Sequence, residues 1–343
     1  MEKIKISVII PIYNTSLYLE KCLRSVMNQS LQEIEIICVN DGSTDNSLEI
    51  LKELEKEDKR IKIINQTNQG VSKARNEALK IARGKYCLNI DSDDWVESKY
   101  LEDMYNIAEL NNSDIVISDI FFDFKYTPTK NYVLKDLDIK SNEVITGKEY
   151  INIFVKGNFY GYTCNKLIKK ELYTQNNIWY NEKIFIREDL EVILRLAYYS
   201  KKINKLNKAH YHYLKHDSTA STEKKEKVLY DTNESFKSLN SFFLKKNEFE
   251  IQEKLNIYWY GTLFYTLLST NKKYDKYEKV VLKLILKIKI RDLFEILPNL
   301  GISLTMYSFL LKIVPFRKTI NLLKFLDKEI VDFLRKIRKS NGK

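Results

Sequence analysis

Apolar and polar positions follow a regular order along the first ninety residues of the chain. Short apolar runs at residues 4–12, 34–39, 61–64 and 85–90 predict four buried strands. Between these runs, apolar residues recur every three or four positions at 17–27, 47–59 and 71–83, and this spacing predicts three helices. Strands and helices that alternate in this way predict an α/β fold with a mostly parallel, Rossmann-like sheet and helices on both faces.

The rest of the chain has a less regular pattern. Residues 115–118 predict another strand, residues 147–155 and 190–199 predict helices, and the polar, aromatic stretch up to about residue 140 predicts a loop or irregular sheet. From residue 223 on, several further helices are predicted, at 229–244, 251–268, 279–290, 302–315 and 320–339. We therefore expect three parts: residues 1–110, residues 111–222, and a helical C-terminal region at 223–343.

Charge separates the last of these parts from the others. The 343-residue chain is 44% hydrophobic and 30% charged, which is typical of a globular protein. Residues 1–222 hold 32 basic and 32 acidic residues, whereas residues 223–343 hold 25 and 14, so the whole formal charge of +11 lies in the C-terminal region.

The basic C-terminal region has three interpretations. Its helices could pack on the core and present lysines to solvent, or residues 272–343 could dock on an anionic membrane surface through apolar burial and charge. Both interpretations are compatible with the three lysines that lie four residues apart on one face of a predicted apolar helix, Lys279, Lys283 and Lys287. No recognised nucleic-acid-binding fold accompanies the charge, so we expect no nucleic acid partner. Homodimer formation is left open.

Several features favour a cytoplasmic protein. The four cysteines are widely spaced, without a Cys-x-x-Cys pair, and predict buried free thiols. The first ten residues predict a strand rather than a secretory signal. No uncharged apolar stretch reaches the roughly 18–20 residues that span a bilayer. We expect a cytoplasmic location, peripheral to the inner face of the plasma membrane.

Candidate chemistry gathers in three loops that follow predicted strands, at residues 11–14, 41–45 and 91–94. Carboxyl ends of parallel strands meet at one edge of a sheet, where ligands bind. Asp91, Asp93 and Asp94 repel one another unless a counter-charge is present, and a divalent cation that also binds a phosphate would supply it. The alternative is an acidic turn that caps the next helix.

Other motifs leave alternatives open. No Gly-x-Gly-x-x-Gly or Gly-Lys-Ser/Thr loop is present, so a bound nucleotide would depend on carboxylates and a metal. Glu188 and Asp189 open a predicted helix, where acids commonly compensate the helix dipole. His210 and His212 alternate along a predicted strand with both rings on one face, which favours a structural role over a zinc site.

Four ordered motifs together resemble family 2 glycosyltransferases. They lie between about residues 5 and 105 and consist of Ser7 to Asn14, Asn40 to Asp45, Asn68 to Asn76, and Asp91 to Asp94. Further on, residues 165–167 and 187–189 are similar to the acceptor half of bacterial surface-polysaccharide members. Asn40 departs from the pattern, because many members have an aspartate there.

The resemblance implies a GT-A fold, a nucleotide-sugar donor, a divalent metal (Mn²⁺ or Mg²⁺) and inversion at the anomeric carbon. It implies that residues 1–110 bind the donor and residues 111–222 the acceptor. For the donor it implies that Pro11 and Tyr13 contact the nucleotide base, that Asp41 accepts a hydrogen bond from uracil, and that Arg75 is a basic group near the nucleotide. It also implies that Asp91 contacts the ribose and that Asp93 binds the metal. Asp189 is implied to be the general base. Weaker matches are Asn14, Asn68, Gly70, Ser92, Asp94, Asn165, Lys166 and Glu188, with Lys215 and His216 at the diphosphate.

These implications predict a glycosyltransferase that moves a sugar from a UDP-sugar to a hydroxyl of a bacterial surface glycan or lipid-linked glycan. The alternative is a nucleotide-sugar-binding partner subunit without catalysis. Because every matched acid is present, the enzyme is favoured.

Overall fold

The computed structural model describes residues 3–125, 132–134, 139, 143–156, 161–215 and 225–268. Its strands are β1 Ile6–Ile12, β2 Ile34–Asp41, β3 Ile61–Gln66, β4 Tyr86–Asn89, β5 Trp95–Val96, β6 Ile115–Phe124, β7 Tyr132–Leu134, β8 Lys166–Lys169 and β9 Ile203–Lys215. Its helices are α1 Ser16–Met27, α2 Ser47–Glu57, α3 Val71–Ile81, α4 Tyr100–Asn111, α5 Gly147–Val155, α6 Lys170–Gln175, α7 Glu188–Tyr199, α9 Lys225–Lys245 and α10 Phe249–Leu268.

The strands form one sheet in the order β3-β2-β1-β4-β8-β6-β9-β5, with β7 beside β6. The first four strands in sequence pair in parallel, as predicted. Strand β8 lies between β4 and β6 and runs antiparallel to both, whereas β6 and β9 are parallel. The predicted α/β class is confirmed, and the antiparallel pairs of the second half are an addition that the sequence did not predict.

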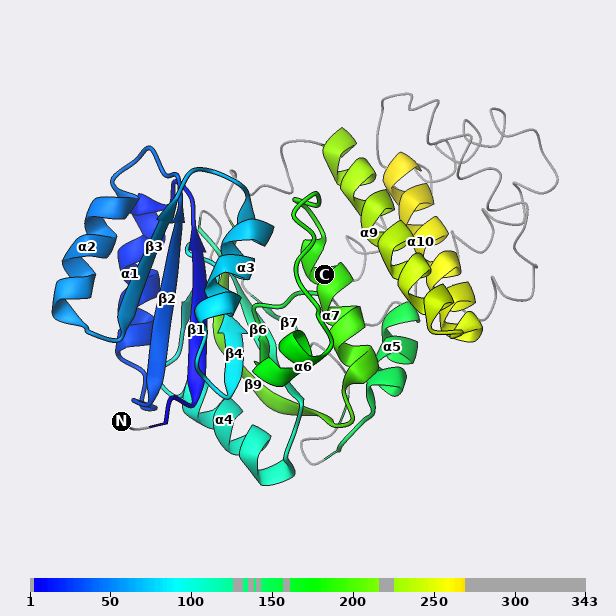
Figure 1. Ribbon diagram of the computed structural model, residues 1–343, viewed down its shortest axis with the longest axis horizontal. Helices are drawn as coiled ribbons and strands as arrows, with labels where there is room; N and C mark the ends of the chain where they lie inside the picture. The colour runs from blue at the N-terminus through cyan, green and yellow to red at the C-terminus, as the bar shows by residue number, and fades with distance from the viewer. Residues whose placement is uncertain are drawn as a thin grey trace, which may run out of the picture. The chain divides into compact units, whose positions relative to one another are not determined.

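Alternating side chains explain how the strands support helices on both faces. Ile6, Val8 and Ile10 of β1 share a buried cluster with Leu19 and Leu23 of α1. Side chains of a strand alternate between faces, so the buried residues between them point to the other side. That side is covered by α3, which packs on β1 and β2 (Figure 1).

Beyond residue 110, several elements are longer than predicted. The strand expected at 115–118 continues to Phe124, because β6 pairs with β9 along almost its whole length, with one irregularity after Ser118. The helix expected at 229–244 is α9, and the one at 251–268 is α10. The helices predicted at 279–290, 302–315 and 320–339 lie outside the described residues, as does the proposed membrane-docking segment 272–343.

The chain divides into two compact units. One contains residues 1–154 and 159–242, and the other contains 155–158 and 243–343. Most of α9 therefore belongs to the first unit, and the predicted boundaries at 110 and 222 stay predictions. All four cysteines are buried and free, as predicted. None of the helices that the structure describes is long and apolar enough to cross a bilayer.

Candidate active site

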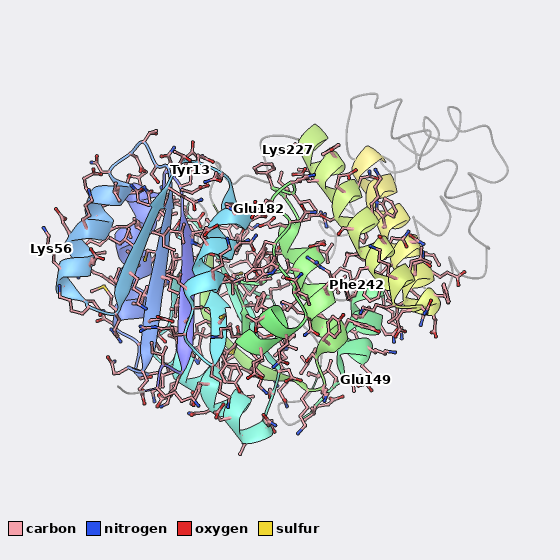
Figure 2. The ribbon with its side chains drawn as sticks, viewed as in Figure 1. Tyr13, Lys56, Glu149, Glu182, Lys227 and Phe242 are labelled. Carbon is pink, nitrogen blue, oxygen red and sulfur yellow. The ribbon has the colours of Figure 1, made fainter. Side chains whose placement is uncertain are left out.

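The loops after β1, β2 and β4 meet at one edge of the sheet and are joined by hydrogen bonds. The Thr44 amide donates to Asn14 Oδ1 (2.8 Å), and the Asn14 amide donates to Ser43 Oγ (3.1 Å). The Thr15 hydroxyl donates to Ser92 Oγ (2.9 Å), which ties the first loop to the third. The predicted convergence of these loops is therefore present, and Figure 2 labels the exposed Tyr13 at this edge. Pro11, just before it, is buried.

Asp41 holds the next loop in place. Its carboxylate accepts hydrogen bonds from Gln66 Nε2 and from the Gln69 and Gly70 amides, all between 2.7 and 2.8 Å. Gly70 has φ = +91°, and a Cβ there would lie 2.8 Å from the Phe185 ring, so a side chain is excluded. Three of the roughly four lone-pair positions of Asp41 serve the fold, which leaves one for a ligand. Asn68 is exposed on the same loop.

The acids after β4 have different environments. Asp94 is buried, and its oxygens accept hydrogen bonds from the Tyr211 hydroxyl (2.5 Å) and the Leu214 amide (2.8 Å). Burial, with Asp93 and Asp91 close by, raises the pKa of Asp94 well above its usual range. Asp91 keeps 31% of its side chain exposed, yet loss of surrounding water and the charges of Asp189 and Asp93 raise its pKa to about 6 against the effect of Arg75. Asp94 is thus structural, whereas Asp91 is accessible to a ligand.

Arg75 joins the two halves of the site. Arg75 belongs to α3, and its buried guanidinium donates to Asp91 Oδ1 (2.9 Å), Glu188 Oε1 (2.8 Å) and Asp189 Oδ1 (2.9 Å). Arg75 was predicted to lie near the nucleotide. The structure adds a second role, because its side chain holds three carboxylates together. The acids that were matched to the donor and to the general base lie within reach of one cation.

Asp189 is held on both of its oxygens. The Thr163 amide donates to Oδ2 (3.1 Å), and the Thr163 hydroxyl donates to Oδ1 (2.8 Å), where Arg75 also donates. The carboxylate stands in the first turn of α7, after Arg187, which has φ = +67°. Its side chain is 17% exposed, so it remains accessible.

Glu188 precedes Asp189 in α7 and bonds the same guanidinium. It is buried, and this burial together with the charge of Asp189 raises its pKa to about 7, although Arg75 acts in the opposite direction. The carboxyl groups of Glu188, Asp189 and Asp91 all bond to the Arg75 guanidinium, so the charge of each one affects the other two. The helix dipole, which favours an ionised acid at this end, is outweighed by desolvation.

Helix α9 supports the segment that leads to these acids. Asp231 Oδ2 accepts hydrogen bonds from the Phe185 and Ile186 amides (both 3.1 Å), and the Ser235 hydroxyl donates to the Arg187 carbonyl (3.2 Å). These residues were not predicted, because α9 was expected to belong to the C-terminal region. Their only sequence signal is a polar stripe at positions 231 and 235, one helical turn apart.

The remaining candidates make other contacts. Asn165 and Lys166 are fully buried, and the Lys166 ammonium donates to Asn165 Oδ1 (2.8 Å), so both support the sheet. Lys215 lies over the rings of Phe122 and Tyr213, and burial lowers its pKa. His216 lies outside the described residues.

The two histidines of β9 contact acids. His210 Nε2 lies 3.0 Å from Asp103, and His212 lies between Asp123 (2.8 Å) and Glu97 (2.9 Å). These contacts support the structural role that their alternation predicted. Among the described residues, no group of three or more His, Cys, Asp or Glu side chains is placed to hold a metal ion by itself.

Known proteins place this fold and site in context. Residues 7–175 match the family described as "Glycosyl transferase family 2". The cholesterol galactosyltransferase of Borreliella burgdorferi is 34% identical over 284 residues, which are 80% of this chain and 77% of that protein. EpsH of Bacillus subtilis is 32% identical over 254 residues, which are 72% of this chain and 71% of that protein.

This chain belongs to glycosyltransferase family 2. The resemblance stated from the four motifs, to a family 2 enzyme of the bacterial surface-polysaccharide type, is thereby confirmed. The structure of this glycosyltransferase is also similar to that of S. aureus TarS 1–349 in complex with UDP-GlcNAc, with a TM-score of 0.70 and 20% identity, covering 95% of this chain and 92% of the TarS 1–349 chain. That likeness concerns the fold, and it confirms the predicted GT-A fold.

Proposed function

We propose that this glycosyltransferase moves a sugar from a UDP-sugar to a hydroxyl group of a growing bacterial surface glycan, with inversion at the anomeric carbon. The observation that carries the proposal is the bridge made by Arg75, which bonds Asp91 on the donor side and Asp189 on the acceptor side. The similarity to TarS, which binds UDP and UDP-GlcNAc, supports a uridine nucleotide as part of the donor.

In a direct displacement the acceptor oxygen replaces UDP at the anomeric carbon, and the acids on the two sides of Arg75 have different roles in it. Asp189 takes the proton of the acceptor hydroxyl while that oxygen attacks the anomeric carbon, and general-base catalysis of this kind contributes typically 10²–10⁴-fold. The bond between the anomeric carbon and the diphosphate oxygen breaks, and UDP leaves from the opposite side. The accessible Tyr13 ring would stack on uracil, and Asp91 would contact the ribose.

A divalent cation fits the donor side. Mg²⁺ is usually bound by one or two carboxylates, with phosphate and water oxygens as the other ligands, so the acids after β4 together with a diphosphate could supply its ligands. Asp93 would hold the ion, either Mg²⁺ or Mn²⁺. When bound, the ion would neutralise charge on the diphosphate leaving group.

Donor hydrolysis by a panel of nucleotide sugars, with Mn²⁺, Mg²⁺ or EDTA, tests the proposal. We expect metal-dependent release of UDP from one UDP-sugar, loss of that activity in Asp93→Ala, and a decrease of at least about 10²-fold in Asp189→Asn with donor binding retained. Near-normal turnover by Asp189→Asn would move the base elsewhere. UDP binding without turnover of any sugar would favour a non-catalytic partner subunit instead.

A further inference from the structure

A buried chain of hydrogen bonds leads from the donor strand to the candidate base. Asn89 Nδ2, at the end of β4, donates to the Tyr180 hydroxyl (2.8 Å). The Tyr180 hydroxyl donates to Thr163 Oγ1 (3.2 Å), and the Thr163 hydroxyl donates to Asp189 Oδ1 (2.8 Å). Asn89 and Thr163 are buried, and burial also raises the pKa of the Tyr180 hydroxyl well above its usual range, so it stays protonated.

The chemistry of these groups allows only one direction for the chain. An ionised carboxylate accepts hydrogen bonds and cannot donate, so the single proton of Thr163 must point to Asp189. Thr163 Oγ1 can then only accept, and the Tyr180 proton must point to it. Tyr180 in turn accepts from the amide of Asn89, and its hydroxyl also hydrogen-bonds with the Tyr173 hydroxyl.

Asn89 shows that this orientation is maintained at a cost. Its carbonyl oxygen is buried and accepts no hydrogen bond from any residue that the structure describes. An unsatisfied buried acceptor destabilises a fold. The amide presents its donor to the Tyr180 hydroxyl, at the far end of the chain that reaches Asp189.

The other contacts of Asp189 show what the chain determines. Within the described part of the protein, Oδ1 accepts two hydrogen bonds, from Thr163 and Arg75, whereas Oδ2 accepts one, from the Thr163 amide. Thr163 therefore holds both oxygens and fixes the plane of the carboxylate. Oδ2 keeps a lone pair for an incoming proton, while the lone pairs of Oδ1 are occupied.

We infer that Thr163 is a positioning residue, supported by Tyr180 and Asn89, which orients Asp189 so that its Oδ2 atom accepts the proton of the acceptor hydroxyl. This inference rests on the proposed function, in which Asp189 is the general base. Charged groups that face Asp189 are Arg75 from α3, Asp91 from the loop after β4, and Glu188 from its own helix. Of these groups only Arg75 donates to Asp189, at Oδ1, so without the Thr163 hydroxyl Oδ1 would have a single donor among the described residues.

The test compares Thr163→Val with Thr163→Ser in the full-length enzyme. Valine keeps the shape and the backbone amide but removes the hydroxyl, so we expect kcat for hydrolysis of the preferred UDP-sugar to fall about 10- to 100-fold, with the donor KM within about threefold. Serine restores the hydroxyl and should recover most of the lost kcat. Thr174→Val, at an exposed threonine of α6, is the matched control and should leave kcat unchanged.

Two further variants keep the inference open to contradiction. Tyr180→Phe should lower kcat less than Thr163→Val, and the double variant should be no slower than Thr163→Val, because both act through one chain. If Thr163→Val does not fold by circular dichroism, Tyr180→Phe alone carries the test. A kcat for the folded variants within about threefold of wild type, while Asp189→Asn is inactive, would overturn the inference and leave the base assignment intact. An active Asp189→Asn would instead overturn the proposed function.

Discussion

One buried guanidinium group, that of Arg75, bonds the carboxylates of Asp91, Glu188 and Asp189. A planar, five-donor group can bond several oxygens at fixed angles, and a lysine ammonium cannot reproduce this geometry. The charge of Arg75 therefore explains only part of its role, and its shape explains the rest.

Replacing Arg75 by lysine tests this role. We expect Arg75→Lys to fold with a free energy of unfolding about 1–3 kcal/mol lower, since at least one buried carboxylate loses its partner. We also expect kcat to fall by about 10²-fold, because the acids move relative to one another. Thermal unfolding and donor hydrolysis measure the two effects. Arg24→Lys, at an exposed ion pair, is the control and should change stability by less than about 0.5 kcal/mol. Wild-type turnover by Arg75→Lys would contradict this reading.

Glu188 gives the site a dependence on pH. Its pKa is raised from 4.5 in the unfolded chain to about 7, so the folded protein binds more protons than the unfolded one between these values. Stability from this group is complete below about pH 4.5 and decreases as the pH rises towards 7. Glu188→Gln removes the titration. The stability of wild type relative to Glu188→Gln should fall by on the order of 1–3 kcal/mol between pH 5 and 8. Parallel unfolding curves for the two proteins across this range would show that Glu188 is ionised throughout.

At the level of elements, α9 positions the segment before α7. Asp231 binds two consecutive amides there, and the segment then turns through the left-handed residue Arg187 into the helix that carries the acids. A side chain that holds two backbone donors replaces the regular hydrogen bonds that this irregular segment lacks. Helix α9 thereby supports the segment that leads to the candidate base.

Removing the Asp231 carboxylate should loosen this segment. We expect Asp231→Ala to lower the free energy of unfolding by about 1–3 kcal/mol, because two amides lose their acceptor. Turnover should fall by about tenfold, since the acids that follow the segment lose their fixed position. Lys237→Ala, at an exposed position of the same helix, is the control. Unchanged hydrolysis by a destabilised Asp231→Ala would mean that the segment keeps its conformation without α9.

At the scale of the whole molecule, we propose that residues 272–343 dock on an anionic membrane surface. Two features support this proposal. The whole net charge of +11 lies in residues 223–343, and apolar residues separate the lysines at 279, 283 and 287. The full-length protein should float with vesicles that contain phosphatidylglycerol, and deletion of 272–343 should abolish flotation. Flotation that is equal with neutral vesicles, or absent for the full chain, would contradict docking by charge.

Local sequence patterns were sufficient to predict the first half of the molecule. The apolar runs specify β1 to β4, and the acids that follow them had to share an edge because parallel strands end together. The second half depends on contacts between distant residues. Arg75 meets Asp189 across 114 positions, and Asn89 meets Tyr180 across 91, so neither pairing leaves a periodic signal. Thr163 and Asp231 are ordinary polar residues until the fold places a carboxylate or two amides beside them.

The place of β8 in the sheet has a consequence for any attempt to divide this enzyme. Strand β8 pairs with β4 on one side and β6 on the other, so it covers the edge of β4 that does not face β1. A fragment that ends near residue 110 would keep the pairing of β4 with β1 but leave the other edge of this short strand without hydrogen-bonding partners. Such edges associate with other chains. The fragment should therefore aggregate on its own, and its solubility depends on a segment that arrives more than fifty residues later in synthesis.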